Sequence, residues 1–529
     1  MSGAAPAPPA APIPWLGLVA VLLGTFLSTL NGRLSTFGLA DIEGAVHAGF
    51  DEGAWITTSQ TVAQMLVAPI AVWMGSAYGP RRVLLWSALA FAIISLITPF
   101  AENLETMLTL RFLGGIASGF FIPLTLSYIL LNMPPRTWAY GIALYALNLE
   151  LSLNISASFE GWYIDHLSWR WIFWQSVPLA LGMSICLRFG GRAGGPSPNP
   201  PPVDFFGLLS FGLGLSFIYA ALDQGNRLDW LNSGLICGLL LAGSILLIAF
   251  VIHDFLIPSP LINLRIVLKP PLPSLLCLVS FLRLTILSTS YLIPQFLGTV
   301  RGFRALEMGG TFYWIALPQL VVCPLAGLLL RRIDPRMVAS VGFILVSYAC
   351  YQVAHNLTPI WGSDQFLLSQ LLQAVGQSFA LSGIVFFAIQ HLRPQDAITF
   401  GAMLQTARLM GGEIGQAFVV TFDRVRSQIA SNLIGLHVQS GDIAVNARIQ
   451  AYAAATRAAG DPLAGTARGA KILGTVVHNL AATEGVIDTF EAIAAFAALA
   501  LILMAAQNPA PRGPATHRSL FAPEKAAQP

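Results

Sequence analysis

The stretch LRFLGGIASGFFIPLTLSYILLNMPP, residues 110–135, decides the class of fold. Arg111 is its only charged residue. An α-helix rises about 1.5 Å per residue, so roughly twenty consecutive apolar residues cross the hydrocarbon core of a bilayer. This stretch is therefore long and apolar enough to form a transmembrane helix.

Similar runs recur along the whole 529-residue chain. The chain is 55% hydrophobic and only 10% charged, whereas soluble domains have roughly 25% charged residues. Such a composition cannot supply the polar shell of a soluble protein, so we predict an all-α polytopic membrane protein. Its fourteen predicted spans lie near 15–38, 54–76, 83–101, 107–131, 138–163, 170–188, 204–222, 232–253, 272–298, 308–330, 337–355, 365–389, 400–423 and 489–507.

The composition also argues against several classes of function. A net charge of +3 gives no basic surplus for nucleic acid. The five cysteines lie far apart in apolar runs, and neither they nor the histidines have the spacing of a metal site. No phosphate-binding GxxxxGK[ST] loop and no nucleophile–base arrangement occurs. We therefore predict a protein that is not an enzyme, needs no cofactor and is not driven by ATP within this chain.

The basic residues set the orientation, because cytoplasmic loops are enriched in Lys and Arg. With the N-terminus inside, the short outside loops hold only Arg170, Arg227, Arg301 and Arg304. The inside loops then hold Arg81, Arg82, Arg136, Arg188, Arg192, Arg265, Lys269, Arg331, Arg332, Arg336 and Arg393. An even number of spans places both termini in the cytoplasm and the long polar segment 424–488 outside.

Two features indicate an internal repeat. Arg81 and Arg336 each follow a span in a short basic loop and are 255 positions apart, and RFLGG (111–115) and QLLQA (370–374) open spans at nearly the same offset. The alternative is that basic loops simply follow spans in many membrane proteins. We predict two six-helix halves with two extra central helices between them. The predicted segments are a disordered tail (1–14), the first half (15–188), a linker (189–203), the central helices (204–253), the second half (270–507, including the amphipathic segment 424–488) and a tail (508–529).

The chain resembles the major facilitator superfamily, specifically the fourteen-span drug:H+ antiporters of the EmrB multidrug-export type. The resemblance covers nearly the whole chain. Besides residues 110–135, it is carried by GAWITTSQTVAQMLVAPIAVW (53–73), WRWIFWQSVP (169–178), ALDQGNRLDW (221–230) and ARLMGGEIGQA (407–417).

This resemblance implies the major facilitator fold and proton-driven export across a bacterial inner membrane. It implies that Arg111 belongs to a fourth-span RxxxG motif associated with proton transfer; the alternative is an anchor for backbone carbonyls. It also implies a periplasmic adaptor and an outer-membrane channel as partners, with segment 424–488 as the docking surface; the alternative is that this segment is a solvated, ordered cap. Gly79, Arg81 and Arg82 match the gating loop, which we expect to brace the inner gate against the other half; the alternative is that the two arginines only reflect the enrichment of basic residues in cytoplasmic loops.

The chain departs from the family pattern at three places. Asn31 stands where the first span usually carries an acid. Ser76 replaces the acid of the gating loop, and Ser156 and Ala157 occupy the Gly-Pro positions of the fifth-span antiporter motif. The last departure weakens the inference of antiport but not that of transport.

Apart from charges within two residues of a span end, seven charged residues fall inside the predicted spans: Arg33, Arg111, Glu150, Glu160, Arg283, Arg408 and Glu413. Each costs roughly 2.5–3.5 kcal/mol at the bilayer centre, so intramembrane charges are functional candidates by default. Four arginines against three glutamates leave a slightly cationic interior, which favours an anionic or weakly acidic amphipathic substrate.

Because the first span lost its acid at Asn31 while the fifth gained Glu150, we predict that proton binding moved to Glu150, with Arg33 as its partner. The alternative is a permanent ion pair that only fixes helix packing. Glu413 has the same two interpretations, with Arg283 or Arg408 as its partner. The proton-coupling candidates are Glu150, Glu413 and Arg111, and the substrate-site candidates are Asn31, Arg33, Arg283, Gln405 and Arg408.

The function that these features favour is export of amphipathic organic compounds, drugs and weak acids among them, by alternating access between two halves. Two alternatives stay open. One is an uptake system or a narrow permease for a metabolite or siderophore. The other is a membrane sensor or scaffold that does not transport.

Overall fold

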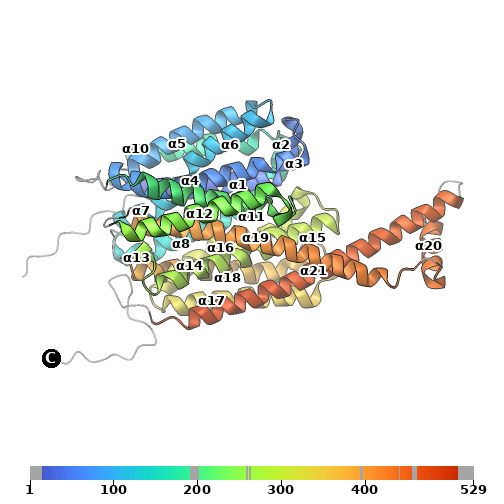
Figure 1. Ribbon diagram of the computed structural model, residues 1–529. Coiled ribbons are helices and arrows are strands. Elements are labelled where there is room, and N and C mark those ends of the chain that lie inside the picture. The colour runs from blue at the N-terminus through green and yellow to red at the C-terminus, as the bar shows by residue number, and fades with distance from the viewer. Residues whose placement is uncertain are drawn as a thin grey trace, which may run out of the picture.

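A computed structural model describes residues 15–190, 202–257, 260, 264–392, 397–439, 441–455 and 462–509, and within them the chain is a bundle of helices (Figure 1). Most of the predicted linker, 189–203, and of the predicted tails, 1–14 and 508–529, lies outside these residues. Those three predictions therefore stay predictions.

The predicted spans of the first half correspond to helices of the structure. These are α1 (Trp15–Phe37), α4 (Trp55–Tyr78), α5 (Pro80–Ile97), α6 and α7 (Leu104–Gly119 and Phe121–Asn132), α8 (Trp138–His166) and α10 (Ser176–Phe189). The two central helices are α11 (Phe205–Gly225) and α12 (Gly234–Leu256). The short helices among and just after them are α2 (Leu39–Ala45), α3 (Phe50–Gly53), α9 (Trp171–Trp174) and α13 (Leu264–Val267).

The second half begins with α14 (Leu272–Leu287), which passes through the π-helical turn η4 (Ser288–Leu292) into α15 (Ile293–Thr299). It continues with α16 (Ala305–Leu330), α17 (Pro335–Asn356), α18 (Leu367–Gln390), α19 (Ala397–Gly435), α20 (Ile443–Ala455) and α21 (Pro462–Ala505). The predicted all-α polytopic class is thus confirmed.

Thirteen helical stretches in the described residues are long and apolar enough to cross a membrane. The remaining predicted span, 400–423, lies in α19, which is not one of them. Its composition explains this, because Gln405, Arg408 and Glu413 interrupt the apolar sequence. α19 nevertheless packs against α7, α14 and α21, so protein rather than lipid surrounds much of its polar surface.

The predicted outer segment 424–488 is a helical projection. α19 continues beyond the bundle to Gly435, α21 begins at Pro462 rather than near 489, and the two helices project together with α20 at their tip (Figure 1). Gly485 lets them approach closely, since a Cβ there would lie 2.0 Å from the Ser427 hydroxyl oxygen. An ion pair between Arg426 and Asp488, at 2.5 Å, also joins them.

Arg81 and Arg336 make equivalent hydrogen bonds in the two halves. The Arg81 guanidinium donates to the carbonyl oxygens of Leu187 and Arg188, both at 2.8 Å, at the end of α10. Arg336 donates to the carbonyl of Gln507, just after α21. Each arginine therefore satisfies carbonyls at the end of the last helix of its half, where a cation is favourable. This shared role supports the internal repeat.

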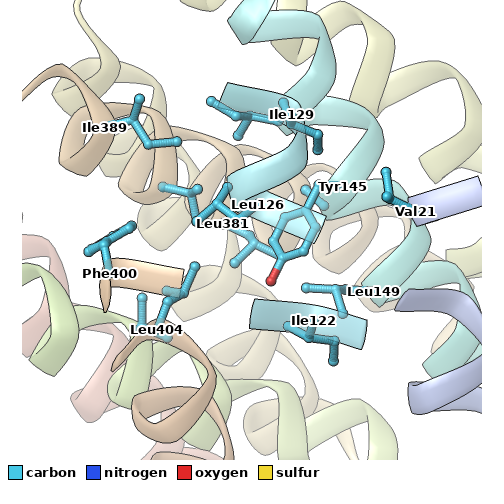
Figure 2. Close-up of a cluster of buried hydrophobic side chains, with 14 of the residues drawn as sticks. Val21, Ile122, Leu126, Ile129, Tyr145, Leu149, Leu381, Ile389, Phe400 and Leu404 are labelled. Carbon is cyan, nitrogen blue, oxygen red and sulfur yellow. The ribbon is translucent and has the colours of Figure 1, made fainter. Parts of the chain in front are cut away.

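At the predicted cytoplasmic face, apolar side chains from both halves meet (Figure 2). Tyr145 of α8 lies fully buried at the centre of this group. The helices approach closely here, because a Cβ at Gly401 of α19 would lie 2.6 Å from the Pro123 carbonyl oxygen of α7. The surrounding side chains come from α1, α7, α8, α18 and α19, and include Val21, Ile122, Leu126, Ile129, Leu149, Leu381, Ile389, Phe400 and Leu404.

The halves also meet toward the other face. Asn154 of α8 donates to Gln319 of α16 at 3.1 Å, and the rings of Phe37 and Phe312 pack edge to face with centroids 6.2 Å apart. The Arg33 guanidinium of α1 donates to the Ser290 carbonyl of η4 at 2.9 Å. The charged residues of the interior therefore lie between contacts at both ends of the bundle.

Candidate functional site

Glu150, near the middle of α8, is the centre of the charged interior and is only 1% exposed. Arg283 of α14 and Arg408 of α19 are the charges that act on it. Among the described residues, however, no ion pair within 4.0 Å includes Glu150, and its Oε2 has no hydrogen-bond partner. Glu150 is thus a buried carboxyl that two guanidiniums approach without contacting.

Arg33 does not pair with Glu150 as predicted. Its guanidinium binds the Ser290 carbonyl and lies 5.1 Å from the centre of the Phe37 ring. The charged side chain that interacts with it electrostatically is Arg283. The prediction rested on which spans had lost or gained an acid, and this pattern does not determine which way a helix faces. In the structure, Arg33 instead links the first half to η4.

Arg408 and Gln405 lie one turn apart on α19, and the Arg408 Nε donates to the side-chain oxygen of Gln405 at 3.1 Å. Arg408 is also in electrostatic range of Arg283, Glu150 and Tyr145. The structure thus brings together four of the predicted residues: Glu150, Arg283, Gln405 and Arg408. They lie beside the apolar side chains that surround Tyr145, and Arg33 lies next to Arg283.

Arg111 and Asn31 form a separate network inside the first half. The Arg111 guanidinium donates to the Asn31 side-chain oxygen at 2.9 Å and to the Ile56 carbonyl at 3.3 Å, and it faces the Phe173 ring at 5.5 Å. Asn31 thus supplies the acceptor where the family usually has an acid. This arrangement favours the interpretation that Arg111 anchors neighbouring helices, and it places Asn31 away from Glu150.

Replacing Asn31 tests this network. Asn31→Leu should lower the free energy of unfolding by about 2 kcal/mol, because it leaves a buried guanidinium N–H without its acceptor. Asn31→Asp keeps an acceptor and should be at least as stable as the wild type. Denaturant unfolding of the purified protein in detergent measures both variants. Equal stability of Asn31→Leu and the wild type would contradict the network.

Glu413 pairs with neither of its predicted partners. It is 5% exposed, and its carboxyl lies near the side chains of Tyr219 and Asp223, both of α11. Asp223 is a functional candidate that the sequence analysis missed, because the predicted span 204–222 ended one residue before it, whereas α11 continues to Gly225. The signal was present in the segment ALDQGNRLDW, which carried part of the family resemblance.

Uncharged polar side chains extend the interior along α18. Gln373 donates to the Ser288 hydroxyl at 2.9 Å, and Gln377 donates to the Gln373 side-chain oxygen at 3.1 Å. Neither polar side-chain atom of the buried Gln370 has a partner. Buried polar groups normally find protein, water or ligand partners, and π-helical turns such as η4 often occur at functional sites.

The gating loop does not brace the other half as predicted. Gly79 has φ 84° between α4 and α5, a left-handed conformation that suits glycine. Arg81 binds α10 of its own half, and Arg82 is exposed. The contact that crosses the halves at this face is made by Arg331, whose guanidinium donates to the Tyr140 hydroxyl at 2.8 Å.

The helices are long enough to span a membrane, and they enclose charged and amide side chains between the contacts that join the two halves at each end of the bundle. This arrangement is that of a polytopic membrane transporter. The chain matches the family model of the Major Facilitator Superfamily over residues 21–416 and belongs to that superfamily. Curated relatives that match over most of their length include multidrug export proteins named EmrB and EmrY.

Three relatives illustrate this. The probable multidrug resistance protein EmrY of Escherichia coli K12 is 26% identical over 79% of this chain and 81% of its own. Multidrug export protein EmrB of Haemophilus influenzae is 27% identical over 75% and 78%. Fatty acid resistance protein FarB of Neisseria gonorrhoeae is 22% identical over 79% and 82%.

Solved structures show the same fold at low sequence identity. The proton:xylose symporter XylE has a TM-score of 0.57 at 11% identity, covering 93% of this chain and 95% of that one. The human organic anion transporter MFSD10 has a TM-score of 0.56 at 15% identity, covering 94% and 100%.

Proposed function

We propose that this chain exports amphipathic organic compounds, drugs and weak acids among them, in exchange for protons. The similarity to multidrug export proteins supports export. The observation that carries the proton coupling is the state of Glu150, a fully buried carboxyl near two guanidiniums but without an ion pair.

Two opposing effects act on such a carboxyl. Burial favours its neutral form, and nearby guanidiniums favour its charged form. A movement of the halves that changes the distance from Glu150 to Arg283 or Arg408 would therefore bind or release a proton. Because both arginines come from the second half and Glu150 from the first, alternating access changes these distances directly.

The substrate site is proposed around Arg33, Arg283, Gln405 and Arg408. Asp223 is a further acid inside the bundle, but it lies with Glu413. Two guanidiniums, those of Arg283 and Arg408, act on the single acid Glu150, and Arg33 lies next to Arg283. This local excess of positive charge favours weakly acidic amphipathic compounds, and the fatty acid resistance protein among the relatives supports the same class.

The proposed location is a bacterial inner membrane, with both termini in the cytoplasm. The projection formed by α19, α20 and α21 would then stand in the periplasm, where it is the proposed contact for an adaptor that leads to an outer-membrane channel. Exposed apolar residues follow one side of its first helix, namely Val425, Ile429 and Leu433, and Leu436 is exposed just after that helix ends. Such spacing suits helix-on-helix packing.

Everted membrane vesicles test the proposal. Respiration acidifies their lumen, and a proton-coupled exporter should dissipate this pH gradient when substrate is added. Ethidium serves as a cationic probe and deoxycholate, below its micellar concentration, as an acidic one. Vesicles without the protein give the background. Dissipation that depends on the protein and is larger with deoxycholate supports the proposal.

Two other results would contradict it. Substrate that enters intact cells with protons would indicate an uptake system or narrow permease. No substrate-linked proton movement with any compound would indicate a sensor or scaffold.

A further inference from the structure

A chain of polar contacts runs along α11 from the predicted outer face toward Glu150. It begins at Asp51, whose side chain is 79% exposed and forms an ion pair with Arg227 at 2.9 Å. The Arg227 Nε donates in turn to the Gln224 side-chain oxygen at 2.8 Å. Solvent therefore reaches the first member of the chain, and the second and third follow it by direct contact.

The next member is Asp223, in the last turn of α11. The Gln224 amide donates to the Thr58 hydroxyl oxygen at 2.6 Å and to the Asp223 carboxylate at 3.1 Å, and the Thr58 hydroxyl also donates to Asp223. The charged groups that act on Asp223 are Arg227, two residues beyond the end of α11, and Glu413 of α19. From α4, which also packs against it, the group facing Asp223 is the uncharged Thr58.

One turn deeper, the Tyr219 hydroxyl lies between helices α4 and α19. Its side chain lies close enough to those of Thr61 of α4 and Glu413 of α19 to interact with both. A phenol in this position can accept a proton on its oxygen while it passes its own proton to the neighbouring acceptor. Tyr219 thus joins Glu413 to the part of α11 that carries Asp223.

Arg283 connects this group to the centre of the site, because it is within electrostatic range of both Tyr219 and Glu150. Glu150 lies beyond the last of these contacts, within the electrostatic range of Arg283; it is 1% exposed, and its Oε2 has no partner. This oxygen, which is separate from the acids on and beside α11, can therefore accept a proton that no neighbouring side chain donates.

We propose that α11 lines the route by which protons enter from the outer face and reach Glu150. A proton from solvent binds the Asp223 carboxylate. It then passes to Glu413 through Tyr219, whose oxygen takes one proton as its hydroxyl releases another, and from Glu413 it moves beside Arg283 to Glu150. Each carrier returns to its starting state, so the net event is movement of one proton. The proposal rests on the proton coupling proposed above, and it gives a function to a helix outside the two six-helix halves.

Reconstituted protein tests the route with two measurements on the same proteoliposomes. The first is proton movement driven by a deoxycholate gradient. The second is exchange of labelled for unlabelled deoxycholate at equal pH, which needs no net proton movement. Asp223→Asn and Tyr219→Phe should slow the proton movement by about tenfold or more, as expected when a proton carrier is removed, and leave exchange close to the wild-type rate. Asp223→Glu keeps a carboxyl and should retain most of the proton movement.

Asp229→Asn is the matched control, since Asp229 is exposed in the loop after α11 and its side chain accepts a hydrogen bond from Asn232. Wild-type proton movement in both Asp223→Asn and Tyr219→Phe would overturn the route while leaving proton coupling in place. An equal loss of exchange and proton movement would also overturn it, because the residues would then be structural. Absence of proton movement in the wild type would instead refute the proposed function itself.

Discussion

Glu150→Gln is expected to abolish substrate-linked proton movement while substrate exchange continues. Glutamine has nearly the shape of a protonated glutamate but can neither bind nor release the proton. The variant should resemble the protein fixed in its proton-loaded state, and net proton-coupled transport should fall by about a hundredfold or more, within the range for removal of a group that transfers protons. The measurement is proton movement and substrate exchange in the same proteoliposomes.

Glu160→Gln is the matched control for this prediction. Glu160 is also buried and lies on α8, but near Asp41 and Asp165 rather than near the arginines. It should keep proton-linked transport. If Glu150→Gln keeps it as well, the assignment of proton binding to Glu150 is wrong.

Arg283→Leu is expected to weaken binding of weak acids by about ten- to a hundredfold, since a charge-assisted hydrogen bond contributes about 1.5–3 kcal/mol. Binding of the cation ethidium should change little or increase. Arg283 also lies beside the proposed proton route, so binding to the purified protein, rather than transport, is the measurement to make.

Arg283→Lys keeps the charge and should retain most of the affinity for deoxycholate. Arg111→Leu provides a comparison, because Arg111 also lies inside the bundle but belongs to the network with Asn31. Should Arg283→Leu lose ethidium and deoxycholate binding alike, the assignment of Arg283 to an acidic substrate would be refuted.

The fold could be predicted because a membrane span is recognisable from the length and hydrophobicity of a single stretch of sequence. Residues 110–135 and similar runs are each long enough to cross the bilayer, and the structure has helices at all of them. α19 is an exception, because Gln405, Arg408 and Glu413 make it too polar to be recognised as a membrane span by composition alone. Its position is explained by its packing against other helices. The extent of α21 was missed for the opposite reason, since its Ala-rich first half forms helix outside the apolar run.

The candidate site could be predicted only in part. The cost of charge in a bilayer identified Glu150, Arg283, Arg408 and Glu413 as unusual, and the structure brings the first three together. Their partners could not be predicted, because these depend on the rotation of each helix about its axis. Arg33 binds a backbone carbonyl of η4, and Glu413 meets Tyr219 of a central helix whose last turn lay beyond the predicted span.

The central claim is that proton movement and substrate export are coupled through Glu150. It is tested most directly by recording internal pH and deoxycholate content together in proteoliposomes with an imposed pH gradient. The account predicts that protons and deoxycholate move in opposite directions in the wild type and that Glu150→Gln stops both net movements. Deoxycholate that accumulates without proton movement, or coupling that survives in Glu150→Gln, would contradict it.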